Sequence, residues 1–232
     1  MKSPERLPTR ALIGYGIASA PVMYAYMLIL IMYMKYAVDD LGASPAAVGS
    51  IFFVAKMWDA ISDPMVGNLS DRTMHRSGRR RPWILAGAPL LAGFGLMAWS
   101  PPAAFEGGAL IAWITVAVLG FYTAYTVFEV PHMSLGAELS LDARERNRIF
   151  GVRQVMRTLG MLAAGILGTW VVGQGVAPAT TMAWVVGGAT LLLVFSGVSL
   201  LPPAREEFRG RGGQNPIKAL RDVLRNRHAR LF

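Results

Sequence analysis

Long apolar blocks fill most of this chain and restrict the class of protein to which it can belong. Of its 232 residues 53% are hydrophobic and 16% are charged, whereas a soluble domain carries about 25% charged residues. The apolar residues form continuous stretches that follow neither the period of two of a strand nor the 3.6-residue period of a surface helix. Blocks of this length cross a lipid bilayer as helices. The sequence therefore predicts an all-α polytopic membrane protein.

Six transmembrane helices fit these blocks. Ser44 followed by Pro45 is a typical helix start, and Pro21 predicts a bend in the first helix. The expected spans cover approximately residues 11–38, 44–69, 82–99, 108–135, 149–172 and 178–201. Residues 1–203 are thus expected to form a six-helix bundle, and residues 204–232 a cytoplasmic linker with the lead-in to a truncated seventh helix. Six spans are half of what many secondary transporters use, so we expect one half of a longer protein.

The basic residues set the expected orientation. The formal net charge is +9, a balance that nucleic-acid-binding proteins also show. Here almost all lysines and arginines lie in the two tails and in alternate loops, such as 76–81 and 144–148, and the intervening loops are acidic or neutral. This is the positive-inside pattern of membrane proteins. It predicts that both ends of the chain are cytoplasmic, with the lipid bilayer and not nucleic acid as the partner.

The sequence carries no signal for enzymatic chemistry. It has no cysteine, which excludes disulfides and thiolate metal sites. It also has no nucleophile motif, no phosphate-binding glycine loop and no cluster of metal ligands. We therefore expect no enzyme and no cofactor, and no metal ion other than Na⁺ as a coupling ion.

Acidic residues inside the apolar blocks are the main functional signal. An ionisable side chain in a bilayer costs several kcal/mol, about 2.5–3.5 on the insertion scale, so it marks a binding site or a pathway by default. Asp59 and Asp63 are four residues apart and therefore lie on one face of the second expected helix. Glu129 lies in the fourth expected helix. At 1.5 Å per residue, Asp63 and Glu129 are about 12 Å and about 13 Å from the cytoplasmic ends of their helices.

The surroundings of these acids favour a cation site. Pro64 and Pro131 each remove a helical hydrogen bond and free a carbonyl one turn earlier. Carboxylates, carbonyls and hydroxyls are oxygen ligands suited to a hard monovalent cation, and a proton shared among the acids is equally consistent. The candidate cation ligands are Asp59, Ser62, Asp63, Thr126 and Glu129. The structural alternative is that the acids pair with Lys56, Arg153 and Arg157 and hold helices together.

Several motifs resemble one transporter family. They are Trp-Asp-Ala-Ile-Ser-Asp-Pro at 58–64, Gly67 with Asp71-Arg72, Gly-Arg-Arg-Arg-Pro-Trp-Ile at 78–84, Glu-Val-Pro at 129–131 and Arg-Glu-Arg at 144–146. Together they are similar to the glycoside–pentoside–hexuronide:cation symporter family, a branch of the major facilitator superfamily. The resemblance covers about residues 15–202. It implies a twelve-helix transporter that works by alternating access, of which this chain is the N-terminal half.

The resemblance also implies roles for individual residues. Asp59 and Asp63 match cation-site carboxylates, Thr126 matches a threonine near the cation, and Ser62 and Glu129 replace an asparagine and an aspartate. The residues expected to contact the substrate, which we call the substrate side, are Met23, Tyr26, Tyr125, Glu129, Met133 and Arg153. The gating residues of the cytoplasmic loops are Asp71, Arg72, Arg79, Arg80, Arg144 and Arg146. Met23 and Met133 stand where family members have a sugar-binding aspartate and a sugar-stacking tryptophan, and Arg153 is one residue away from the family's arginine.

The sequence thus predicts a symporter in the cell (inner) membrane that couples sodium or protons to a sugar or related polar solute. The missing C-terminal six-helix half is the expected protein partner. An amphipathic or lipid-like solute is the first alternative, because Met23 and Met133 remove polar groups from the substrate side. A half-size membrane sensor or scaffold that does not transport is the second.

Overall fold

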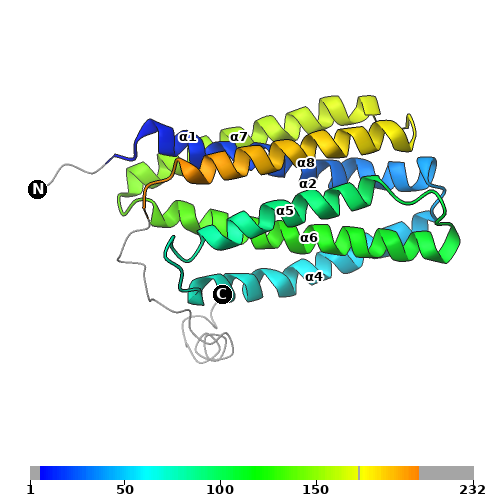
Figure 1. Ribbon diagram of the computed structural model, residues 1–232, viewed down its shortest axis with the longest axis horizontal. Coiled ribbons are helices and arrows are strands. Elements are labelled where there is room, and N and C mark those ends of the chain that lie inside the picture. Colours follow the sequence, from blue (N-terminus) through cyan, green and yellow to red (C-terminus); the bar gives the residue numbers. More distant parts are fainter. Residues whose placement is uncertain (1–5, 172, 204–232) are drawn as a thin grey trace, which may run out of the picture.

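The computed structural model describes residues 6–171 and 173–203, and the expected linker at 204–232 lies outside this part. In the described part, long helices run side by side along one axis (Figure 1). After a first rod at Thr9–Asp40 come five uninterrupted helices. They are α4 (Pro45–Arg72), α5 (Arg81–Trp99), α6 (Gly107–Glu138), α7 (Ala143–Val171) and α8 (Val176–Ser199). The all-α prediction is confirmed for these residues.

The first rod is composite. It consists of α1 (Thr9–Ile17), α2 (Ser19–Met27), α3 (Tyr33–Lys35) and two π-helical segments, η1 (Leu28–Met32) and η2 (Tyr36–Asp40). The break between α1 and α2 falls at Ala18, three residues before Pro21, because Pro21 has no N–H to donate to the carbonyl of Ile17. The two π-helical segments were not expected from the sequence.

Four of the helical stretches are long and apolar enough to cross a membrane, among the described residues. They are Thr9–Asp40, Arg81–Trp99, Gly107–Glu138 and Val176–Ser199. The expected second and fifth spans, α4 and α7, have the length but carry the charged side chains of the candidate site, including Asp59 and Asp63 on α4 and Arg153 on α7. Charge in the middle of these two helices is what lowers their hydropathy.

Helix packing follows a twofold pattern. The α6 helix packs against α4 and α5, the first rod packs against α7 and α8, and α5 packs against α8 (Figure 1). If the first rod, α4 and α5 are exchanged in order with α6, α7 and α8, the same pairs of neighbouring helices result. Such internal symmetry is typical of transporters built from structural repeats.

Glycines permit the closest helix crossings. A Cβ added at Gly160 would lie 2.2 Å from the carbonyl oxygen of Ala20, and one at Gly87 would lie 2.9 Å from the backbone of Phe128. Small residues allow two helix backbones to approach each other in this way. Around Gly165, in contrast, nothing lies within 4 Å of such a Cβ.

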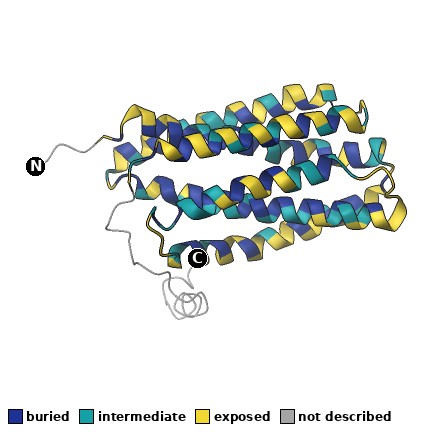
Figure 2. Cartoon of the chain, viewed as in Figure 1, coloured by how far each residue is buried: buried dark blue, intermediate teal, exposed yellow. Residues whose placement is uncertain are grey.

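Exposed positions recur along the helices of the bundle (Figure 2), and on α4 and α7 many of them carry large apolar side chains. On α4 they include Phe53, Met57, Ile61 and Met65, which are between 52% and 68% exposed. Water does not tolerate continuous apolar faces of this size, whereas lipid or another protein surface does. These faces therefore belong against the bilayer or against further protein.

The helix α7 begins at Ala143, six residues before the expected membrane span at 149–172. The three-residue spacing of Asp142 and Glu145 is that of a capping box and predicts this start. Asp142 does cap the helix, because the backbone N–H of Glu145 donates to Asp142 Oδ1 over 2.9 Å. The reciprocal bond of a capping box is missing. The Glu145 carboxylate instead accepts hydrogen bonds from the backbone N–H of Leu7 and from Arg148, both at 3.1 Å.

Candidate functional site

Three of the expected cation ligands meet where α4 packs against α6. Thr126 Oγ1 donates a hydrogen bond of 2.8 Å to Asp63 Oδ1, and Ser62 Oγ lies 3.5 Å from Thr126 Oγ1. Ser62 and Thr126 are buried, whereas Asp63 is exposed on the open side of α4. A carboxylate and two hydroxyls thus form an oxygen-rich group that is reachable from one side.

Asp59, one turn earlier on α4, has a different neighbour. Lys56 Nζ lies 3.1 Å from Asp59 Oδ2 and donates a 2.9 Å hydrogen bond to the Tyr26 hydroxyl. The same ammonium lies 4.3 Å from the ring centroid of Tyr122, a cation–π contact. Asp59 Oδ1 is buried and has no hydrogen-bond partner among the described residues. The ion pair weighed as the structural alternative is therefore present at Asp59.

Glu129 on α6 is held by two arginines of α7. Arg153 and Arg157 both donate to the same oxygen, Glu129 Oε1. The second carboxylate oxygen, Oε2, is buried without a partner in the described structure, and so is Arg153 Nε. The Arg153 side chain is only 9% exposed. Two buried groups in this cluster, one acceptor and one donor, thus have unused hydrogen-bonding capacity.

Two stacked tyrosines connect the α4 and α7 groups. Tyr26 and Tyr125 stack with ring centroids 4.4 Å apart. Tyr26 accepts from Lys56, and the Tyr125 hydroxyl lies 3.5 Å from Arg157 Nη2. Contacts therefore run without interruption from Asp59 through this pair to Glu129.

The acids do not converge on one point. No group of three or more acidic or histidine side chains in the described part could hold a metal ion together. Asp59, Asp63 and Glu129 each contact a different partner, which is Lys56 for Asp59, Thr126 for Asp63 and an arginine pair for Glu129. The described residues therefore provide no single metal centre that all three acids share.

The two methionines of the expected substrate side lie apart. Met23 on α2 is buried in the bundle, whereas Met133 on α6 is 57% exposed. Beside Met133, His132 is fully enclosed: its ring stacks on Tyr15 at 4.4 Å, its Nε2 lies 3.0 Å from the Tyr15 carbonyl oxygen, and the Tyr15 hydroxyl donates to the His132 carbonyl. This reciprocal pair joins α1 to α6.

A second charged cluster joins the ends of three helices. Arg80, with only 6% of its side chain exposed, pairs with Asp71 at the end of α4, with Glu138 at the end of α6 and, at 2.6 Å, with Ser70. Arg79 also binds Glu138, at 2.6 Å. We call Ser70, Asp71, Arg79, Arg80 and Glu138 the Arg80 cluster. The exposed Arg72 and Arg144, and the half-buried Arg146, form no ion pair within the described residues.

Several residues that the structure places in these clusters were not candidate site residues from the sequence. Lys56 and Arg157 entered only as alternative partners for the acids, and Ser70 and Glu138 had no assigned role. Their spacing did carry a signal, because Lys56 precedes Asp59 by one helical turn and Arg157 follows Arg153 by one turn. Tyr122, one turn before Tyr125, was missed entirely.

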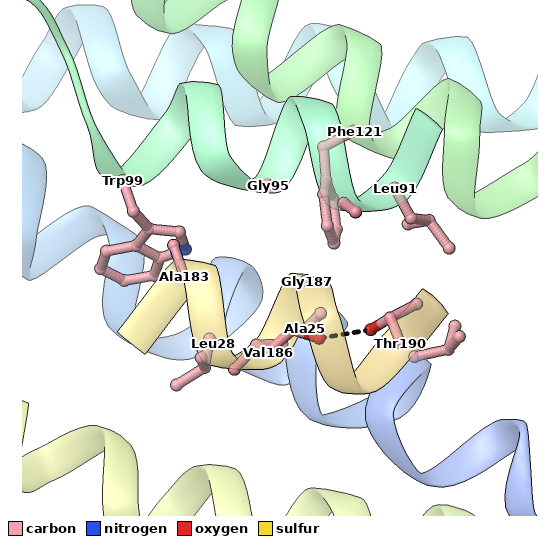
Figure 3. A pocket seen from close by; sticks show the side chains of 12 residues that line it. Ala25, Leu28, Leu91, Gly95, Trp99, Phe121, Ala183, Val186, Gly187 and Thr190 are labelled. Carbon is pink, nitrogen blue, oxygen red and sulfur yellow. Dashed lines mark hydrogen bonds between the residues drawn. The ribbon is translucent and has the colours of Figure 1, made fainter. Parts of the chain in front are cut away.

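A cavity among α2, α5, α6 and α8 lies away from these charges (Figure 3). Its walls are apolar and include Leu28, Leu91, Trp99 and Phe121. The hydroxyl of Thr190 also lines it, but donates to the Val186 carbonyl of its own helix over 2.8 Å. None of the residues that line the cavity is charged, so it offers no counter-charge to an ion.

The family model described as MFS/sugar transport protein matches residues 14–232. The chain belongs to this family. The resemblance expected from the motifs is thereby confirmed, and the protein is an integral membrane protein of the major facilitator type.

Individual relatives are named as symporters. The inner membrane symporter YicJ of Escherichia coli is 35% identical over 168 residues, which are 72% of this chain and 36% of the relative. The putative glycoside/cation symporter YagG of the same organism is 27% identical over 95% of this chain and 48% of its own length. A sodium-dependent lysophosphatidylcholine symporter, 1-B of Danio rerio, is 29% identical over 76% of this chain and 34% of its own length. The chain thus spans between a third and a half of these relatives.

Proposed function

We propose that this chain is the N-terminal half of a cation-coupled symporter for a sugar or related polar organic solute, working by alternating access. The observation that carries the proposal is the Asp63, Ser62 and Thr126 group, which places a reachable carboxylate and two hydroxyls at the α4–α6 crossing. Hard monovalent cations prefer oxygen ligands of this kind. Membership of a transporter family, with relatives named as symporters, supports the same reading.

The membrane arrangement completes the proposal. All six rods cross the bilayer, including α4 and α7, whose charges face inward to the candidate site and to a second six-helix half. Both ends of the segment are cytoplasmic because the basic residues gather on that side. The name of the Escherichia coli relative supports the inner membrane as the location.

In this arrangement Asp63 and Asp59 bind the coupling ion, and Glu129 links it to the solute. Sodium would use the Asp63 oxygens together with Ser62 and Thr126, whereas a proton would reside on a carboxylate. The substrate side is formed by Tyr26, Tyr125 and Arg153, with Met23 and Met133 shaping its apolar part. The Arg80 cluster holds the cytoplasmic ends of α4, α5 and α6 together and acts as the gate in one state of the cycle.

The test is ion-driven uptake by the full-length protein in vesicles across a panel of neutral, charged and amphipathic solutes. A solute that accumulates only when a sodium or proton gradient is imposed supports the proposal. If no solute responds to either gradient, while the protein is inserted and folded, the chain acts as a membrane sensor or scaffold.

A lipid-like solute is the second candidate. Met133 is exposed beside the candidate site, where the family's sugar binders have a tryptophan, and Met23 replaces an aspartate. Several relatives are named as lysophosphatidylcholine symporters. Uptake of a lysolipid, without uptake of sugars in the same panel, would favour this candidate.

A further inference from the structure

The helices of the bundle form two packing groups. The α6 helix packs closely against α4 and α5, and the first rod packs closely against α7 and α8. Between the groups, α5 packs broadly against α8, whereas α6 meets α7 at only a few positions. The ion pairs of Glu129 cross this sparse boundary, because Glu129 lies on α6 and Arg153 and Arg157 lie on α7. Their geometry therefore depends on what holds α6 against the other group.

One side-chain pair joins the two groups close to these ion pairs. His132, one helical turn after Glu129, is fully buried. Its ring stacks on those of Tyr15 and Phe128, with centroids 4.4 Å and 5.0 Å away. Its Nε2 lies 3.0 Å from the Tyr15 carbonyl oxygen and carries the hydrogen, because a carbonyl only accepts. The Tyr15 hydroxyl donates back to the His132 carbonyl over 3.1 Å. We call this pair the His132–Tyr15 joint.

The backbone around the joint is suited to it. Tyr15 lies in the last turn of α1, where a helix leaves carbonyls without intrahelical partners, so its oxygen can accept a donor from α6. Gly136, one turn after His132, leaves room for the Tyr15 ring, because an added Cβ would lie 2.2 Å from the Tyr15 hydroxyl oxygen. The joint thus combines a stack, two hydrogen bonds and a close fit.

Tyr15 connects in turn to the arginines of α7. Its neighbour Gly16 lies against that helix, where an added Cβ would be 2.8 Å from Val152 Cγ1. Val152 directly precedes Arg153, which binds the carboxylate on α6. The contacts therefore close a ring. It runs from that carboxylate along one turn of α6 to His132, across to α1, on to α7 and back.

We propose that His132 is a positioning residue. Its hydrogen bond to Tyr15 sets the separation of α6 and α7 at which Glu129 meets the two arginines. The inference rests on the proposed role of Glu129 in linking ion and solute, and it names the residue that holds this acid in register. Loss of the bond should weaken the Glu129 ion pairs although none of their own atoms has changed.

A double-mutant cycle tests this proposal without any solute. Thermal unfolding of the purified full-length protein is measured for His132→Phe, which keeps an aromatic stack and removes the donor, for Arg157→Gln, and for both together. Independent residues give additive losses, whereas coupled ones do not. We expect each single variant to melt a few degrees below wild type. In the His132→Phe background, Arg157→Gln should cost at most about half as many degrees as in wild type.

Tyr33→Phe is the matched control. The Tyr33 hydroxyl donates to the Ala98 carbonyl over 3.1 Å and so joins the same two groups, roughly 27 Å further along the first rod at 1.5 Å per residue. Its loss should simply add to that of Arg157→Gln.

Rescue gives a second check on the donor. Glutamine carries its amide nitrogen as many bonds from the backbone as histidine carries Nε2, whereas the amide of asparagine is one bond nearer. His132→Gln should therefore restore the coupling, and His132→Asn should not.

Additive losses for His132→Phe and Arg157→Gln would overturn the proposal, and so would coupling of equal size in the cycle with Tyr33→Phe. If His132→Phe does not fold, Tyr15→Phe, which removes only the reciprocal hydroxyl, replaces it and is judged by the same criterion.

Ion-driven uptake of the solute panel by the same variants separates this proposal from the proposed function. His132→Phe should flatten the ion dependence of uptake as Glu129→Gln does, and His132→Gln should retain it. Coupling in the melting cycle without any ion-driven uptake in wild type would contradict the symporter and leave the joint intact. Uptake whose ion dependence is the same in His132→Phe as in wild type would show that the joint does not position Glu129.

Discussion

Gly160→Ala measures how tightly α7 is fitted against α2. The added Cβ would lie 2.2 Å from the Ala20 carbonyl oxygen, where ordinary contact begins at 3.4 Å. The helices must therefore separate by roughly 1 Å, and overpacking of this kind costs about 1–3 kcal/mol. Alanine also favours the helix by up to about 1 kcal/mol over glycine, which offsets part of the cost.

Gly165→Ala is the matched control on the same helix, because nothing lies within 4 Å of its added Cβ. It gains the helix propensity without the clash, so the two variants should differ by about 1–3 kcal/mol in unfolding free energy. Thermal unfolding of the purified protein in detergent measures this difference. Because Arg157 lies one turn before Gly160, we also expect weaker solute binding in Gly160→Ala alone. Equal melting temperatures for the two variants would refute the close crossing of α2 and α7.

Three further predictions test the orientation, the linking acid and the gate. Single cysteines at Ser77 and Ser100 should label from opposite sides of the membrane, with Ser77 reachable only from the cytoplasm; external labelling of Ser77 in intact cells would reverse the topology. Glu129→Gln should lower the affinity for cation and solute together and flatten the ion dependence of solute binding in calorimetry, and an unchanged ion dependence would remove Glu129 from the mechanism. Arg80→Gln should lower the melting temperature, because it removes the more buried of the two arginines that pair with Asp71 and Glu138 and leaves Arg79 as their partner, a loss of about 1.5–3 kcal/mol; an unchanged melting temperature would show that Arg80 contributes no stability to the cluster.

The sequence predicted the helices better than their contacts. Apolar blocks locate helices because only a helix satisfies its own backbone in lipid. The start of α4 and both ends of α5 fall within one residue of the expected spans. The first turn and a half of α7 is mostly polar, so hydropathy locates only the span from residue 149, whereas the spacing of Asp142 and Glu145 predicts the helix start that Asp142 caps. The π-helical segments of the first rod depend on packing with other helices and leave no mark in local composition.

For the candidate site, the sequence identified the acids and their possible partners, but not which partner each acid contacts. Helical spacing places Asp59 and Asp63 on one face, yet it gives no information about neighbouring helices. That Thr126 reaches Asp63, while Arg153 and Arg157 reach Glu129, follows from how α6 crosses α4 and approaches α7. Such contacts depend on tertiary structure, so a list of polar residues in spans could not separate an ion ligand from an ion-paired carboxylate.

Uptake by Asp59→Asn and Asp63→Asn tests whether these two carboxylates bind the coupling ion. Asparagine keeps the shape of each side chain and removes the charge that compensates the coupling ion. We predict that solute binding without an ion gradient survives in both variants, whereas the dependence of uptake on sodium or pH is lost in Asp63→Asn and weakened in Asp59→Asn. Uptake by both variants with the wild-type dependence on sodium and pH would show that these acids are structural, and would contradict the account.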